Sequence, residues 1–66
     1  MTEDERRRLR HDLRTPLTIV TGFSEVLAAD RPISDEARRD YAARIHAAAE
    51  ELRQMIDVLL DEESAA

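Results

Sequence analysis

The sequence contains no cysteine, no tryptophan and no lysine, and it has one glycine, one phenylalanine and one tyrosine among 66 residues. The absence of cysteine excludes disulfide bonds and thiolate metal sites. With so few aromatic residues, a core built on aromatic side chains is not expected. A chain of this length forms one domain at most, and such a small domain is only marginally stable alone. Support from oligomerisation is therefore expected.

Long apolar runs are also missing. No stretch approaches the ~20 residues that span a bilayer, and the N-terminus lacks the apolar segment of a signal peptide. We expect a soluble, cytoplasmic segment without membrane contact, although its parent can be membrane-anchored. The net charge of −5 argues against generic nucleic-acid binding. One basic run is the exception, and we interpret it as a solvated helix face paired with nearby acids: Arg6, Arg7, Arg8 and Arg10 with Glu3, Asp4 and Glu5.

The residues that are present favour helix, since Ala, Leu, Arg and Glu dominate. Residues 30–33, which include Pro32, interrupt the chain near its middle. Ser34 then has the position of an N-cap, with Asp35 and Glu36 in the following first turn. The sequence therefore predicts one domain over 1–66, with a helix at about 2–29, a turn at 30–33 and a helix at about 35–62.

Apolar residues in both expected helices recur at alternating steps of four and three, which is a heptad seam. The first seam is Leu9, Leu13, Pro16, Val20, Phe23 and Leu27; the second is Tyr41, Ile45, Ala48, Leu52, Met55 and Leu59. Further apolar residues widen each stripe: Leu17, Ile19, Ala28, Ala49, Ile56 and Leu60. One hairpin covers only part of such stripes. The pattern predicts an all-α, two-helix antiparallel hairpin that dimerises into a four-helix bundle.

A polar face lies opposite the first seam. At about 100° per residue, His11 points roughly 160° away from the seam, and Thr15, Thr18 and Gly22 follow it on the same face. Asp12 lies only about 60° from the seam, so we expect a carboxylate that is partly desolvated by packing. A carboxylate that accepts the proton-bearing ring nitrogen's hydrogen bond makes the other nitrogen a better nucleophile. Arg14 lies about 60° from His11 and could reach a phosphate oxygen.

Pro16 stands inside an otherwise regular helix. It lacks the N–H that would bond the carbonyl of Asp12, and its ring crowds that carbonyl. A kink one turn beyond His11 is expected. Such a kink suits either an element that bends between signalling states or a static bend tolerated by packing.

The stretch from His11 to Leu17, HDLRTPL, resembles the H-box of the histidine kinase A phosphoacceptor family, also called the dimerisation and histidine phosphotransfer domain. The continuation from Thr18 to Leu27 and the second expected helix are similar to the family's two helices. The resemblance implies that His11 is autophosphorylated on the ring nitrogen farther from the backbone. It implies Asp12 as general base, Thr15 as the residue that positions water for dephosphorylation, and Pro16 as the kink. Many members have Glu where this chain has Asp12.

Partners and cofactors follow from the resemblance too. It implies a homodimer, a response-regulator receiver domain whose aspartate takes the phosphoryl group, and a separate ATP-binding domain of the parent kinase that carries ATP and Mg²⁺. No cofactor or metal is expected on this chain, which we interpret as a fragment and not a complete enzyme. His46 is interpreted as solvated surface. A stand-alone histidine phosphotransfer protein and a purely structural dimeric signal-relay hairpin remain the alternatives.

Overall fold

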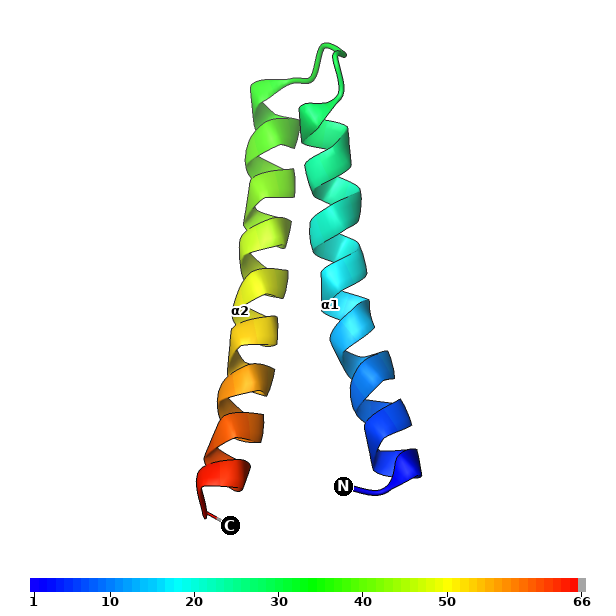
Figure 1. Ribbon diagram of the computed structural model, residues 1–66. Helices are drawn as coiled ribbons and strands as arrows, with labels where there is room; N and C mark the ends of the chain where they lie inside the picture. The colour runs from blue at the N-terminus through cyan, green and yellow to red at the C-terminus, as the bar shows by residue number, and fades with distance from the viewer. Residues whose placement is uncertain (66) are drawn as a thin grey trace.

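The computed structural model describes the backbone of residues 1–65 and the side chains of residues 1–61. It contains two helices, α1 (Glu3–Ala28) and α2 (Asp35–Ala65), and no strand within the described residues. Figure 1 shows them as an antiparallel hairpin with both termini at the same end. The predicted all-α class and hairpin are confirmed. Within the described residues neither helix holds an apolar stretch long enough to cross a membrane.

Capping side chains explain where both helices begin. The Thr2 hydroxyl accepts a hydrogen bond from the backbone N–H of Glu5 at 3.1 Å and donates to the Glu5 carboxylate at 3.0 Å. Ser34 accepts a hydrogen bond from the Ala37 N–H at 3.0 Å, which confirms it as the predicted cap. Each hydroxyl satisfies an N–H that has no partner inside its helix.

The helix ends differ slightly from the prediction. The last residue of α1 is Ala28, one residue early, and the N–H of Ala29 closes the final turn on the carbonyl of Glu25 at 3.0 Å. The helix α2 begins at Asp35 as predicted and continues to Ala65, beyond the predicted end at 62. The prediction stopped early although no Gly or Pro follows residue 62 to end the helix. Ala66 lies outside the described residues.

The two seams are confirmed residue by residue. Every described side chain of α1 that is not exposed belongs to the predicted seam: Leu9, Leu13, Pro16, Val20, Phe23 and Leu27. In α2 the corresponding set is Tyr41, Ile45, Ala48, Leu52, Met55 and Leu59, joined by Ala37 and Glu50. The heptad pattern therefore identifies which face of each helix meets the other.

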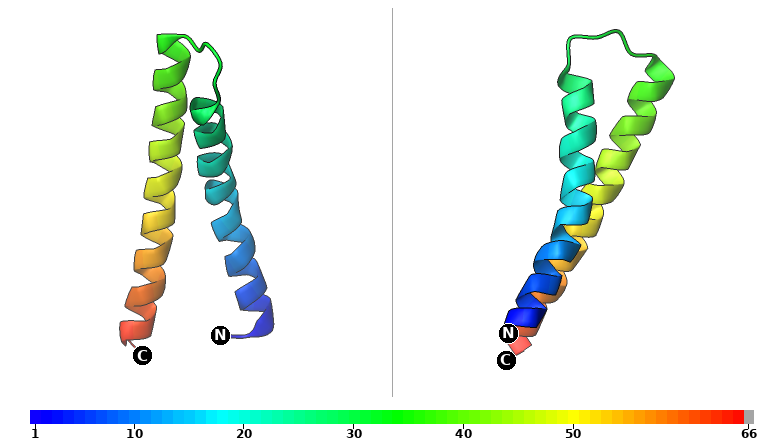
Figure 2. Two further views of the ribbon diagram at one scale, coloured as in Figure 1. Left: turned by 45° about the horizontal axis from the view of Figure 1, so that its top comes forward. Right: turned by 90° about the vertical axis from the view of Figure 1, so that its right-hand side faces the viewer.

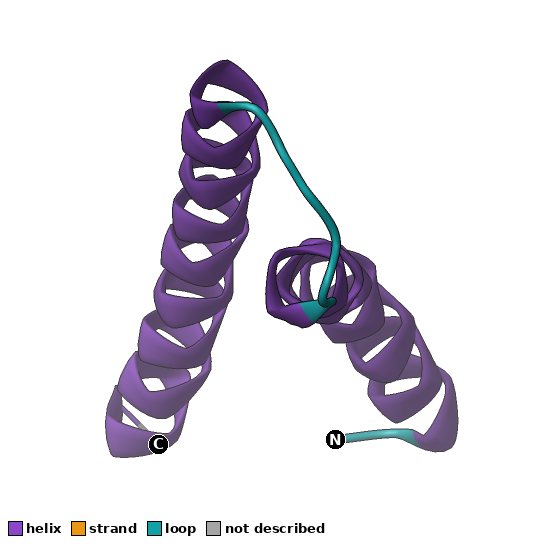
Figure 3. Ribbon diagram, turned by 90° about the horizontal axis from the view of Figure 1, so that it is seen from above, coloured by secondary structure: helices purple, strands orange, loops and turns teal. Residues whose placement is uncertain are grey.

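The contact between the helices is thin. The hairpin measures 50 × 20 × 13 Å, and the helices separate toward the two termini and cross at an angle (Figures 1, 2 and 3). Only Pro16 and Ala48 are buried among residues 1–61. Large apolar side chains stay substantially exposed: Leu17, Ile19, Val26, Ile56, Val58 and Leu60. The hairpin has an interface but no closed interior.

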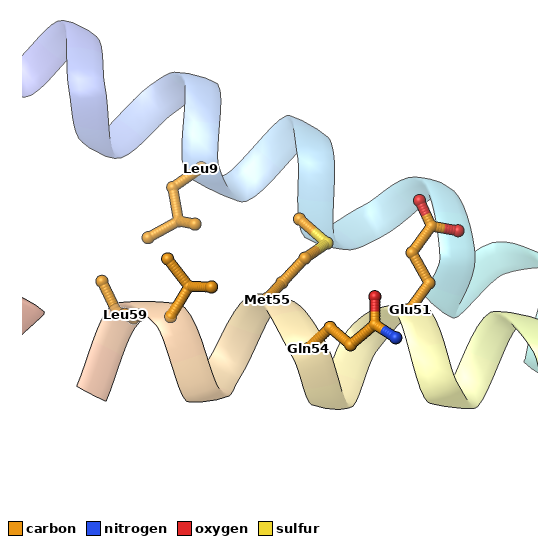
Figure 4. A pocket seen from close by; sticks show the side chains of 6 residues that line it. Leu9, Glu51, Gln54, Met55 and Leu59 are labelled. Carbon is orange, nitrogen blue, oxygen red and sulfur yellow. The ribbon is translucent and has the colours of Figure 1, made fainter. Parts of the chain in front are cut away.

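Contacts at both ends fix the register. Near the turn, the rings of Phe23 and Tyr41 lie 5.0 Å apart between centroids. Near the termini, Leu9 lines a hollow with Met55 and Leu59, and Figure 4 shows Leu9 pointing toward the α2 side chains. The two buried residues, Pro16 and Ala48, lie between these end contacts along their helices.

Candidate functional site

His11 occupies the third turn of α1, on the face turned away from α2. Its side chain is exposed, and so are Thr15, Thr18 and Gly22 along the same face. A Cβ placed on Gly22 would meet nothing within 4 Å. The predicted solvent-facing histidine is confirmed, and the small residues beyond it leave room for a second protein to approach.

Hydroxyl groups near this face bond to the helix backbone. Thr15 donates to the carbonyl of His11 at 3.4 Å, a long and therefore weak hydrogen bond. Thr21 donates to the carbonyls of Leu17 and Thr18, both at 3.1 Å. Because the Thr15 bond is weak and the residue is exposed, its hydroxyl is free to turn toward solvent.

Pro16 does not end the helix. The helix α1 runs through it without a break, and the proline ring is buried. Since proline has no N–H, the carbonyl of Asp12 loses its usual helical donor at this point. Figure 1 shows the N-terminal half of α1 leaning away from α2. The kink and its role in signalling stay predictions.

Asp12 differs from expectation. Its side chain is exposed, so the prediction of a partly desolvated carboxylate is wrong for the single hairpin. The helices separate toward the termini (Figure 1), and a position at the edge of the seam is therefore left uncovered. Arg14 is exposed as well. Among the described side chains, no hydrogen bond joins the His11 ring to Asp12 or to Arg14.

A shallow surface recess is lined by His11 together with Asp4, Arg7 and Arg8. All ion pairs within 4.0 Å among residues 1–61 lie in α2, so the interpretation of the basic run as paired with Glu3, Asp4 and Glu5 is wrong. The run is solvated, as expected. Sequence reasoning did not connect Arg7 and Arg8 with His11, although their spacing of four and three residues carries that signal.

Two of the four ion pairs in α2 up to Asp61 share Arg53. It lies 2.8 Å from Glu50 and 3.6 Å from Asp57. The hydrogen bond from Arg53 and its charge lower the pKa of Glu50 below its ordinary value of 4.5. His46 is exposed nearby, as predicted. Within the described residues no group of three or more His, Asp or Glu side chains gathers in a way that could hold a metal ion.

Known proteins resemble this chain over most of its length. The profile of the His Kinase A (phospho-acceptor) domain family matches residues 7–65. The sensor histidine kinase YcbM of Bacillus subtilis is 36% identical over 53 residues, which are 80% of this chain and 17% of that protein. The cell-division control histidine kinase PdhS of Brucella ovis is 36% identical over 56 residues, 82% of this chain and 5% of that protein.

A third relative is the non-motile and phage-resistance protein of Caulobacter vibrioides, 34% identical over 55 residues, which are 80% of this chain and 6% of that protein. The chain thus spans between 5% and 17% of the length of these relatives. No solved structure matches it significantly.

Proposed function

Because this chain belongs to the His Kinase A (phospho-acceptor) domain family, we propose that it carries the phosphoryl group of a two-component sensor histidine kinase on His11. The observation that supports this proposal most strongly is the exposure of that imidazole on a helix face left open by α2, inside a stretch that the family profile matches. An incoming phosphoryl donor needs such access.

The reaction requires little covalent chemistry from this chain. The outer ring nitrogen of His11 attacks the γ-phosphorus of ATP, which a separate ATP-binding domain holds with Mg²⁺; the phosphorus–nitrogen bond forms as the bond to the ADP oxygen breaks. Asp12 takes the proton of the other ring nitrogen, so that the imidazole ring of the product is neutral. Positioning and charge neutralisation supply most of the remaining catalysis. The positive charge of Arg14 helps to neutralise the phosphate oxygens.

The phosphoryl group then moves to an aspartate of a response-regulator receiver domain. The open face above His11, formed by Thr15, Thr18 and Gly22, accommodates that partner. In a separate phosphatase reaction, Thr15 positions the water that hydrolyses the aspartyl phosphate of the regulator. These steps place the module in the cytoplasm, where ATP is available.

A second copy of the chain completes the fold in this proposal. The single hairpin leaves Leu17, Ile56 and Leu60 about half exposed beside the seam. Solvent-exposed apolar surface of this extent favours association. Two hairpins that place these flanks together form a four-helix bundle with a continuous core.

The test is phosphorylation in the presence of the parent kinase's ATP-binding domain and labelled ATP. We expect one acid-labile, base-stable phosphate per chain. His11→Ala loses it and keeps its helical circular dichroism, whereas the control His46→Ala keeps it. A purely structural hairpin would acquire no phosphate, and a stand-alone phosphotransfer protein would take it from a phosphorylated receiver without any kinase domain.

A further inference from the structure

The charges around the two histidines differ. His11 shares its recess with the guanidinium groups of Arg7 and Arg8, and with one carboxylate, Asp4. Neither arginine makes an ion pair within 4.0 Å among residues 1–61. His46, which is also exposed, has Ala42 and Ala43 at the same two positions, and its nearby charged group is the carboxylate of Glu50. Arginines therefore stand at these two positions beside His11 and not beside His46.

Helix geometry directs these groups toward one point. Side chains three and four residues apart are neighbours on a helix surface, with Cβ atoms roughly 5–6 Å apart. Because Cα–Cβ bonds tilt toward the N-terminus, the imidazole of His11 leans over the turn that holds Arg7 and Arg8. Arg6 points about 140° away from His11 at 3.6 residues per turn, and it does not line the recess.

We propose that Arg7 and Arg8 form an anion-binding wall that holds the phosphoryl oxygens once His11 is phosphorylated. The inference rests on the proposed function and adds to it, because it places two further cations, besides Arg14, beside the phosphohistidine on the same helix. Guanidinium groups suit this task, since their planar N–H donors match phosphate oxygens in pairs. The carboxylate of Asp4, in the same recess, partly offsets the positive charge of the two arginines. No α2 side chain described up to Asp61 lines the recess.

The wall can be tested without any kinase domain. Phosphoramidate phosphorylates accessible histidines directly: its phosphorus–nitrogen bond breaks, the bond to the imidazole nitrogen forms, and the ring proton leaves with the departing ammonia. Treating the full chain with it, and assigning the two signals with His46→Gln, gives two phosphohistidines in one molecule. A ³¹P NMR titration at low ionic strength then yields the pKa at which each phosphoryl group gains its second negative charge.

A nearby cation favours the doubly charged form and lowers this pKa. We expect the pKa at His11 to lie below that at His46. Arg7→Gln and Arg8→Gln should each raise it by about half a pH unit, the Coulomb shift for unit charges roughly 6 Å apart in water. Asp4→Asn should lower it. The matched control Arg6→Gln removes the same charge from the same run of arginines. It should change the phosphoryl pKa at His11 by less than about 0.2 of a pH unit. The His46 signal serves as the internal reference.

Three results would overturn the wall. Equal pKa values at the two phosphohistidines would show that the arginines do not face the phosphoryl group. If Arg6→Gln changed the pKa at His11 as much as Arg7→Gln does, the shift would come from the overall charge of the basic run and not from arginines beside the phosphoryl group. Phosphorylation of His46 but not of His11 would show that the recess is closed to the group. None of these measurements uses a kinase domain. The arginine wall can therefore fail while the kinase assay still supports the proposed function, and the reverse result is equally recognisable.

Discussion

Truncation of Ile56 gives a quantitative test of the dimer. Ile56→Ala removes three carbon groups, and at about 0.8 kcal/mol per buried group full burial of them contributes about 2.4 kcal/mol. The side chain is 48% exposed in the hairpin. About half of that free energy, roughly 1.2 kcal/mol per chain, is therefore gained only when a partner covers Ile56.

Two copies lose this contribution together, about 2.4 kcal/mol per dimer, which corresponds to a roughly 50-fold weaker dimer at 1.4 kcal/mol per factor of ten. Sedimentation equilibrium over a range of chain concentrations measures the dissociation constant, with circular dichroism to verify that the variant stays helical. Arg39→Ala is the control, because Arg39 is exposed on the face of α2 opposite its seam.

Two outcomes would refute the reasoning. The unsubstituted chain could sediment as a folded monomer at micromolar concentration, in which case the exposed flanks are not an interface. Alternatively, Ile56→Ala could dimerise within a factor of two of the parent, in which case the partner covers a different surface of the hairpin.

Four further substitutions test separate residues. Asp12→Asn should slow phosphorylation of His11 by about 100-fold or more, since it removes the general base, while sedimentation shows an intact dimer. Thr15→Ala should spare phosphorylation and reduce dephosphorylation of the receiver; equal loss of both would contradict its role. Ser34→Ala should lower the free energy of unfolding by about 1 kcal/mol in urea titrations, because the Ala37 N–H loses its partner. Glu50→Gln removes a carboxyl whose pKa lies below its unfolded value because of Arg53, so the stabilisation is present above about pH 4.5 and lost as the pH falls below it. The difference in melting temperature between parent and variant should therefore shrink in acid, and a constant difference would oppose the assignment.

Periodicity and capping were enough to predict the architecture. The seams could be located because a side chain's angular position around a helix depends only on its residue number, and that position decides which side chains meet the other helix. Ser34 could be recognised because a hydroxyl before an acidic first turn has one well-defined role. The outward direction of His11 follows from the same angular argument, and the structure confirms it.

Features that depend on long, exposed side chains or on the spacing between helices could not be predicted. The pairing of Arg7 and Arg8 with nearby acids was wrong, since helical spacing permits an ion pair but does not hold two solvated side chains together. The exposure of Asp12 results from the separation of the helices, which no heptad pattern encodes. The contact of Arg44 with the Phe23 ring, 5.8 Å from its centroid, likewise depends on the register across the turn.

The burial of Pro16 and Ala48 near the middle of their helices has a mechanical consequence. Two small, buried groups at the centre of the hairpin form a fulcrum for any rocking of α1 against α2. At about 1.5 Å per residue, Glu3 lies roughly 20 Å along α1 from that point and His11 roughly 7.5 Å. If the segment from Glu3 to Pro16 pivots there as a rigid rod, a displacement at Glu3 reaches the imidazole at about two fifths of its amplitude. A large movement at the start of α1 would in this way become a smaller movement of the His11 side chain relative to α2.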